Sequence, residues 1–281
     1  MIAMKLSYII MRSANNNTKT ALSGPAIPAL ERGLDVLEHV SGVDTPLTLT
    51  AIARLCGRSV SELQRVVACL HQRGYLFRDA GGTYRVSSKL FRMGQACPPF
   101  QDLLTRSRLP MRRFAQTSGE AVHISVLAED RLLILANVPG PGYLQLGINA
   151  GTPHDPILSA SGRVFLAAML PAEYEAFIKR NSIKPERVKA LNPRLARIGR
   201  SGYECVESHL YCGVYDLALA VKSRDGECVA ALACSYLRPR NYSAAGRTLA
   251  MQTLLPKLRQ CAQQIAAAFD SVPSGQEEAM P

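Results

Sequence analysis

The spacing of apolar residues predicts three helices in the first quarter of the chain. Apolar positions recur at helical intervals over residues 28–41, and a short helix is expected between a capping Thr48 and the terminal Gly57. A third helix is predicted from about Ser59 to Gln72. Its buried stripe would be formed by residues at relative positions 0, 3, 7 and 10, namely Val60, Leu63, Val67 and Leu70.

A β-hairpin is predicted directly after the third helix. Residues 75–79 and 83–86 alternate between apolar and polar side chains on either side of Ala80-Gly81-Gly82, and a Gly-rich turn between such segments is typical of a hairpin. Three helices followed by a hairpin is the order of a winged helix-turn-helix. In that arrangement the third helix enters the major groove of DNA and the wing contacts the backbone.

The remaining pattern indicates a mixed α/β domain. Strands are expected at 121–127, 132–138, 143–148, 217–222 and 228–236, and helices at 101–117, 159–170, 172–181, from Asn192-Pro193 onward, and at 243–269. Pro256 should kink the last helix or mark its true start. The fold class is therefore α+β. The predicted parts are a winged helix-turn-helix domain at 26–95, a linker helix at 96–118, an α/β domain at 119–270, and disordered tails at 1–25 and 271–281.

Composition narrows the class of protein. The 281 residues suggest two domains, and 47% hydrophobic with 20% charged residues argues against wholesale disorder. No apolar run reaches the roughly 18–20 residues of a membrane helix, and the first eleven residues lack a secretory signal, so a cytoplasmic protein without membrane association is expected. Eight scattered cysteines indicate reduced thiols. Because the common catalytic and cofactor motifs are absent, we expect no catalytic residues, no cofactor and no enzyme activity.

Charge points to a nucleic-acid partner. The net charge is +11, and residues 54–92 hold eight basic and two acidic side chains. Such an excess is typical of phosphate binding, although charge alone also fits a solvated basic face. The outer side of the third helix is small and polar, so Ser61, Gln64 and Arg65 are predicted to reach bases or nearby phosphates. Glu62 would either repel phosphate or accept from a cytosine amino group. The predicted DNA-binding residues are Arg58, Ser59, Ser61, Gln64, Arg65, Arg78 and Arg85.

Small residues at 158–162 form a candidate anion site. A helix starting there would direct open backbone N–H groups and the positive end of its dipole at a ligand, and Gly162 would leave room for it. A plain serine cap in a packed domain explains the same residues. Asp216 could bond a ligand hydroxyl or pair with an arginine. The candidate effector-binding residues are Ser159, Ala160, Ser161, Gly162, Asp216, Ala218, Ala220 and Ser235.

One group of residues has partial metal-site character. Cys205, His209 and Cys212 supply three potential zinc ligands within eight residues. A fourth ligand is missing and the segment is expected to be a loop, so no metal is predicted. His123 and His154 are too isolated in the sequence to support a ligand or a base.

The order of several motifs resembles the IclR family of bacterial transcriptional regulators. Similar segments are Ala29–Leu37, Leu47-Thr48-Leu49, Arg65–Leu70, Gly119–Val126 and Ala160–Ala167, and the similarity spans about residues 26–270. The resemblance implies a winged helix domain, a linker helix and a GAF-like α/β domain that binds a small organic acid or related metabolite. It also implies a homodimer or homotetramer, and it favours the effector interpretation of residues 159–162.

The predicted function is therefore a ligand-responsive transcriptional regulator. It would bind a double-stranded DNA operator and a small-molecule effector that carries a carboxylate. The alternative is a metabolite-binding or enzymatic domain fused to a nonspecific nucleic-acid-binding module.

Overall fold

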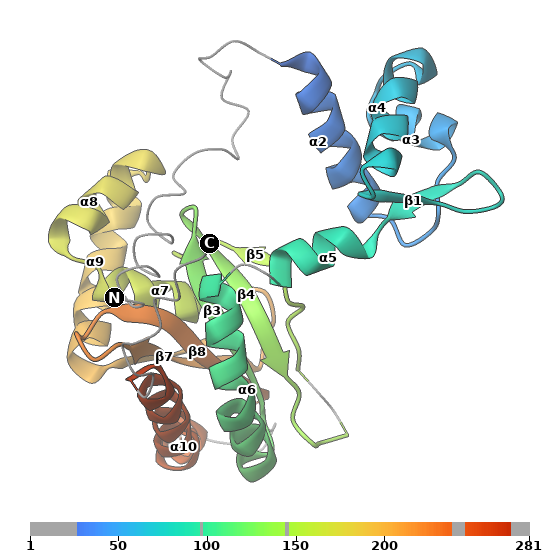
Figure 1. The fold of residues 1–281 in the computed structure, drawn as a ribbon. Coiled ribbons are helices and arrows are strands. Elements are labelled where there is room, and N and C mark those ends of the chain that lie inside the picture. The colour runs from blue at the N-terminus through green and yellow to red at the C-terminus, as the bar shows by residue number, and fades with distance from the viewer. Residues whose placement is uncertain (1–26, 96–97, 144–145, 238–244, 271–281) are drawn as a thin grey trace, which may run out of the picture. The chain divides into compact units, whose positions relative to one another are not determined.

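The computed structural model of the chain divides into two compact units (Figure 1). It describes residues 27–95, 98–143, 146–237 and 245–270, so the predicted disordered tails lie outside the described residues. The boundary between the units falls between Gln101 and Asp102, inside a helix rather than before it. We refer to residues 27–101 as the N-terminal domain and to residues 102–270 as the C-terminal domain.

The N-terminal domain has the predicted winged helix-turn-helix order. Its helices are α2 (Pro28–Ser41), α3 (Leu49–Leu55), α4 (Val60–Gln72) and α5 (Ser88–Gln95), and its strands are β1 (Leu76–Arg78) and β2 (Tyr84–Val86). Thr48 caps α3 by accepting the Ala51 N–H at 3.2 Å. Apolar side chains from all three leading helices and the hairpin form one core: Val36, Val40, Ile52, Ala53, Leu63, Val67, Leu76 and Tyr84.

The wing is an antiparallel hairpin with a fixed turn. Phe77 pairs with Arg85 in the register, and the Asp79 carboxylate accepts the Thr83 N–H at 2.8 Å and its hydroxyl at 2.6 Å. Leu47 adds an isolated bridge to Tyr84. The prediction that Val60 belongs to the buried stripe is wrong, because its side chain is 39% exposed. Val60 is the first residue of α4, where the helix begins at the edge of the core.

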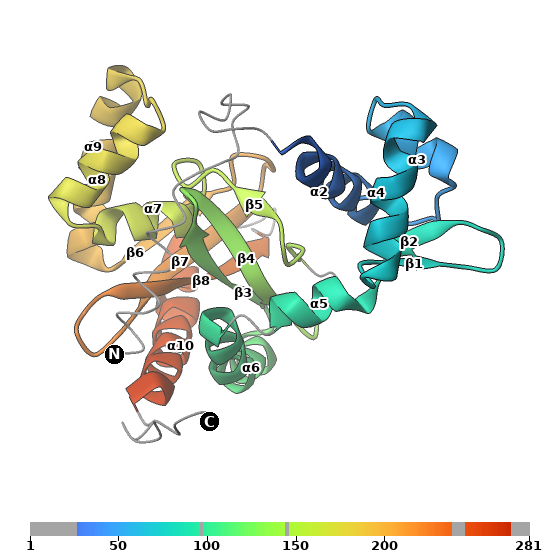
Figure 2. The same cartoon turned by 45° about the horizontal axis from the view of Figure 1, so that its top comes forward.

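The C-terminal domain is built on a six-stranded antiparallel sheet with the order β5-β4-β3-β8-β7-β6 (Figure 2). The strands are β3 (Ala121–Ala128), β4 (Arg131–Val138), β5 (Pro153–His154), β6 (Tyr203–Glu207), β7 (Val214–Lys222) and β8 (Cys228–Leu237). The central strands β3 and β8 are buried over almost their whole length, which explains why they read as continuous apolar runs.

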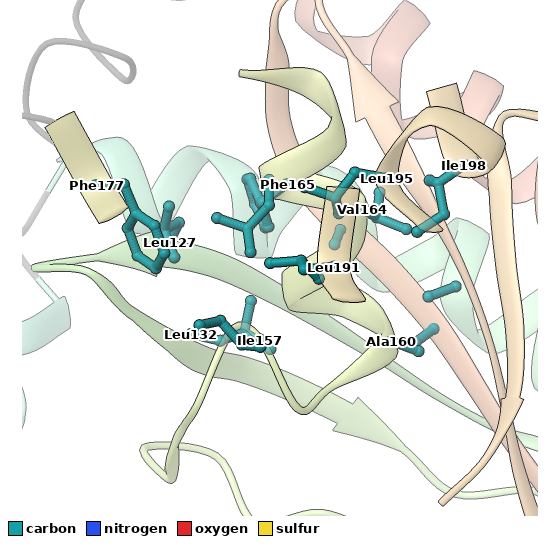
Figure 3. Close-up of a cluster of buried hydrophobic side chains, with 14 of the residues drawn as sticks. Leu127, Leu132, Ile157, Ala160, Val164, Phe165, Phe177, Leu191, Leu195 and Ile198 are labelled. Carbon is teal, nitrogen blue, oxygen red and sulfur yellow. The ribbon is translucent and has the colours of Figure 1, made fainter. Parts of the chain in front are cut away.

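Helices cover both faces of this sheet. The helices α6 (Pro98–Ser118) and α10 (Ala245–Asp270) lie side by side, with Lys257 Nζ donating to the Thr117 carbonyl at 2.6 Å. The opposite side carries α7 (Ala160–Ala168), α8 (Pro171–Arg180) and α9 (Pro185–Ser201). Figure 3 shows Leu191, Leu195 and Ile198 of α9 in the apolar cluster that this layer forms with the sheet.

Several element predictions differ from the structure. The described residues of 143–148 form no strand, and the edge strand is β5 instead. Helix α9 begins at Pro185, not at Asn192, and runs through Pro193. The loop expected at residues 205–212 is only partly present, because residues 205–207 belong to β6. Pro256 does not mark the start of the last helix, since α10 begins at Ala245 and continues through Pro256. Both prolines are exposed, so the lost hydrogen bonds face solvent. Within the described ranges, no helix combines the length and apolarity needed to cross a membrane.

Candidate nucleic-acid interface and effector site

The outer face of α4 is presented as the sequence predicts. Leu63 and Val67 are 0% and 1% exposed, whereas the residues of the opposite face are all exposed: Ser61, Gln64, Arg65, Ala68 and Gln72. A concave surface at this face is lined by Arg32 of α2 together with residues 61, 62, 64, 65 and 68 of α4. Among the described residues, the side chains of Gln64 and Arg65 make no hydrogen bond or ion pair, so these groups are available for a ligand.

The start of α4 is a capping box. Ser59 Oγ accepts the Glu62 N–H at 3.3 Å, and the Glu62 carboxylate accepts the Ser59 N–H at 2.9 Å and its hydroxyl at 2.7 Å. These bonds to Ser59 lower the pKa of Glu62, with a smaller contribution from Arg32, whose guanidinium lies 3.8 Å away.

Glu62 therefore has a structural role that the sequence prediction missed. Its charge is engaged at the helix start, and Ser59, predicted to contact DNA, is its capping partner. The Ser-x-x-Glu pattern at 59–62 was the signal that could have identified it.

The predicted backbone-contacting arginines lie on exposed surface. In the wing, the Arg78 guanidinium lies 5.6 Å from the Tyr84 ring centroid, and that of Arg85 lies 4.9 Å from the Phe77 centroid. Stacking on a ring leaves the edge of a guanidinium free to donate. Arg58 forms an ion pair of 3.5 Å with Asp35 of α2.

The first turn of α7 departs from the predicted anion site in two respects. Ser159 caps the helix by accepting the Gly162 N–H at 3.1 Å, so that amide is occupied. Gly162 does not leave space for a ligand, because a side chain there would meet the Pro156 backbone, with the Pro156 carbonyl carbon only 2.6 Å from an added Cβ. The amides of Ala160 and Ser161 have no partner within the described chain.

Polar side chains gather on the sheet face that α7 covers. Asp216 of β7 accepts the Ser235 hydroxyl at 2.6 Å, and burial raises the pKa of Asp216, against the effects of Ser235 and Arg163. Ala218 and Ala220 continue the same face of β7, because alternate residues of a strand point the same way.

Two histidines that looked isolated in the sequence join this group. Burial lowers the pKa of His123 to about 4, with His154 adding to the shift. Burial also lowers the pKa of His154, where His209 adds to the effect and Asp216 opposes it. The Nε2 atom of His154 is buried without a hydrogen-bond partner in the described structure. Neutral imidazoles can donate and accept, so this face offers both functions to a ligand.

A buried ion-pair network holds α7, α9 and β6 together. Glu204 of β6 has a fully buried side chain that accepts from Arg194 at 2.9 Å and from Arg197 at 3.2 Å, and it lies 3.6 Å from Arg163 of α7. Arg163 also donates to the Ile157 carbonyl at 2.9 Å. Burial lowers the pKa of the Arg163 guanidinium. No local pattern in the sequence indicates this network, because its members are spread over 42 positions.

The three potential zinc ligands do not converge. Cys205 is part of β6, not of a loop, and its sulfur lies 3.4 Å from the Tyr236 hydroxyl. Cys212 is exposed in the turn before β7. In the part of the chain that the structure covers, no group of three or more suitable side chains could hold a metal ion.

A winged helix with an exposed polar face on α4, followed by a mixed α/β domain, is the architecture of a DNA-binding regulator with a separate ligand-binding domain. Family models agree: residues 29–80 match the IclR helix-turn-helix domain, and residues 100–267 match the bacterial transcriptional regulator IclR C-terminal domain. The chain belongs to the IclR family of bacterial transcriptional regulators.

Curated relatives include an operon regulator and a transcriptional repressor. The glycerol operon regulatory protein of Streptomyces coelicolor is 28% identical over 70% of this chain and 80% of its own length. The transcriptional repressor IclR of Escherichia coli is 23% identical over 77% and 82%.

Solved structures show the same fold at low identity. An IclR homolog from Microbacterium hydrocarbonoxydans, complexed with 4-hydroxybenzoate, has a TM-score of 0.72 and 22% identity, covering 87% of this chain and all of that one. The Thermotoga maritima IclR has a TM-score of 0.67 at 17% identity, covering 86% of this chain and all of that one.

Proposed function

We propose that this regulator binds its operator through the outer face of α4 and the wing. The observation that carries the proposal is the exposed row of Ser61, Gln64 and Arg65, whose side chains are polar and lie opposite the buried stripe. Gln and Arg side chains can bond two edge atoms of one base. The wing arginines and Arg58 would contact phosphates, which position the protein without reading sequence.

Arg65→Ala tests this assignment. DNA fragments selected from the genome by the full-length protein serve as probes in fluorescence anisotropy. If Arg65 reads a base, affinity for the selected fragment falls by about 1–3 kcal/mol while affinity for random DNA changes little; if Arg65 meets only phosphate, all sequences weaken alike and the salt slope drops by about one. Arg131→Ala, which removes an exposed charge from the C-terminal domain, is the matched control. Wild-type affinity in Arg65→Ala, Gln64→Ala and the double variant would exclude this face.

We infer that the effector is a small organic acid with a second polar group. The Ala160 and Ser161 amides at the start of α7 suit a carboxylate, since the helix dipole favours negative charge there. Asp216 and Ser235 would receive a hydroxyl, because a buried carboxylate accepts hydrogen bonds and repels a second acid. The relative complexed with 4-hydroxybenzoate binds a molecule with both groups. A panel of aliphatic and aromatic hydroxy acids, 4-hydroxybenzoate included, should raise the melting temperature of the full-length protein.

We propose further that the protein is a cytoplasmic homodimer or homotetramer that regulates without catalysis, with residues 26–95 and 119–270 as its two functional domains. Regulatory relatives support the absence of catalysis. Light scattering with size-exclusion chromatography reports the oligomeric state directly.

A further inference from the structure

The positive charge of the C-terminal domain is concentrated in one segment. Residues 179–200 contain eight basic side chains and one acidic one, whereas the rest of residues 119–270 has a net charge of −3. Most of this segment is α9, which lies in the outer layer over the sheet (Figure 2). The positive charge per residue in this segment exceeds that of the winged-helix region, where the net charge is +6 over residues 54–92.

Three of the basic residues lie on the outer face of α9. Leu191, Leu195 and Ile198 point into the apolar cluster, so the opposite side of the helix faces outward (Figure 3). At 100° per residue, Lys189, Arg197 and Arg200 fall within about 80° of one another on that outer side, and all three are exposed. The helix has 17 residues, which corresponds to roughly 25 Å, the length of about seven base pairs of DNA.

The side chains between the charges favour a polyanion over a protein partner. Ala190, Pro193, Ala196 and Gly199 separate the basic residues, and none of the exposed large hydrophobic residues of the described chain belongs to α9. Protein interfaces rely on apolar and aromatic anchors at their centre, and this surface has none. Small residues beside flexible cations instead allow a phosphodiester backbone to approach closely.

Part of the surface is already held in place. Arg194 and Arg197 are fixed by the buried Glu204, while the Arg197 side chain remains 61% exposed. Because Arg197 is anchored through Nη2 alone, its other donors stay available for a second acceptor, and it loses little conformational entropy when it binds.

We propose that the outer face of α9 is a second DNA contact, which binds the phosphate backbone without reading sequence. The C-terminal domain would thereby hold DNA itself in addition to sensing the effector. This contact is independent of the α4 assignment and of the effector site.

The test compares two double variants of the full-length protein on random-sequence duplexes of 20 and 60 base pairs. Lys189→Gln with Arg200→Gln removes two charges from α9 and spares the Glu204 network. The matched control, Lys222→Gln with Arg224→Gln, removes two exposed charges from the turn between β7 and β8. Each lost phosphate contact lowers the slope of log K against log salt by about 0.9.

We expect the α9 variant to reduce the salt slope on the 60-base-pair duplex by nearly two per protomer, while the control variant retains the wild-type slope. If the α9 variant has the same salt slope as the control variant, the proposal is overturned, and an acidic protein becomes the better candidate partner for this surface. Equal reductions of the salt slope in both variants would show that only the net charge of the protein matters, and they would also overturn the proposal. Binding of wild type to the 20-base-pair duplex separates these outcomes from a failure of DNA binding altogether.

Discussion

At the level of single residues, the buried imidazole of His123 makes the stability of the C-terminal domain depend on pH. Its side chain is 5% exposed, and burial lowers its pKa from 6.5 to about 4. Between these values the unfolded chain binds a proton that the folded chain does not, so stability falls as the pH drops from about 6.5 towards 4. The loss amounts to about 3 kcal/mol, since a tenfold change in proton affinity corresponds to about 1.4 kcal/mol.

His123→Gln should remove this component. Urea unfolding of both proteins between pH 7 and 4 provides the measurement, and the difference in unfolding free energy between variant and wild type should shift by about 3 kcal/mol across the range. His209→Gln, an exposed histidine of the same domain, serves as control and should follow the wild-type curve more closely. If the unfolding free energies of His123→Gln and wild type ran parallel over this pH range, His123 would take up its proton at the same pH in the folded protein as in the unfolded chain.

Two glycines that differ in the space around them predict opposite effects of an alanine substitution. A Cβ at Gly162 would collide with the Pro156 backbone, whereas a Cβ at Gly199 would meet nothing within 4 Å. Gly162→Ala should therefore destabilise the C-terminal domain by roughly 1–3 kcal/mol through overpacking. Gly199→Ala, in the exposed last turn of α9, should stabilise it by about 0.5–1 kcal/mol. Thermal unfolding measures both, and a stable Gly162→Ala protein would show that the segment at Pro156 yields easily.

At the level of elements, the sequence was most informative where one local rule acted alone. The bounds of α2, the cap of α3 and the strands of the wing follow from periodicity, a capping threonine and a glycine turn. The predictions failed where tertiary contacts overrode such rules. Pro193 looked like a helix start, yet α9 begins eight residues earlier with Pro185 in its first turn. The helix continues through Pro193, because Leu191 and Leu195 on either side of it are buried in the apolar cluster.

The candidate sites show the same division. The outer face of α4 could be predicted because one helix supplies all of it. The partners of Glu204 and the grouping of His123, His154 and Asp216 could not, since they come from separate elements that only the folded sheet brings together. Gly162 was predicted to leave room for a ligand, but the space beside it is filled by the Pro156 backbone, which the local sequence pattern did not indicate.

The Glu204 network should carry much of the cohesion between α7, α9 and β6. Glu204→Gln leaves Arg163, which is 4% exposed, without its negative partner, and removing one member of a buried pair costs about 3–5 kcal/mol. Chemical unfolding measures the loss. Glu175→Gln, an exposed glutamate on α8, is the control and should change stability by less than about 0.5 kcal/mol. An effect of Glu204→Gln as small as that of the control would show that solvent reaches the arginines.

At the level of the whole molecule, effector binding and DNA binding should be coupled with equal strength in both directions. A ligand alters DNA affinity only by binding the DNA-bound and DNA-free states differently, and the same factor must then appear in its own affinity when DNA is present. For the hydroxy acid that raises the melting temperature most, we expect a factor of about 5–150, which corresponds to a coupling energy of about 1–3 kcal/mol.

Asp216→Asn separates this coupling from DNA binding itself. The amide keeps the size of the side chain but loses the charge that accepts from Ser235 and from the ligand, so effector affinity should fall while DNA affinity without effector stays at the wild-type value. Asp225→Asn, in the exposed turn between β7 and β8, is the control. Calorimetric titration of effector with and without a DNA fragment, repeated as DNA titration with and without effector, closes the cycle. The two factors must agree at equilibrium, so their equality checks the titrations themselves. An unchanged effector affinity in Asp216→Asn would move the effector away from the sheet face that α7 covers.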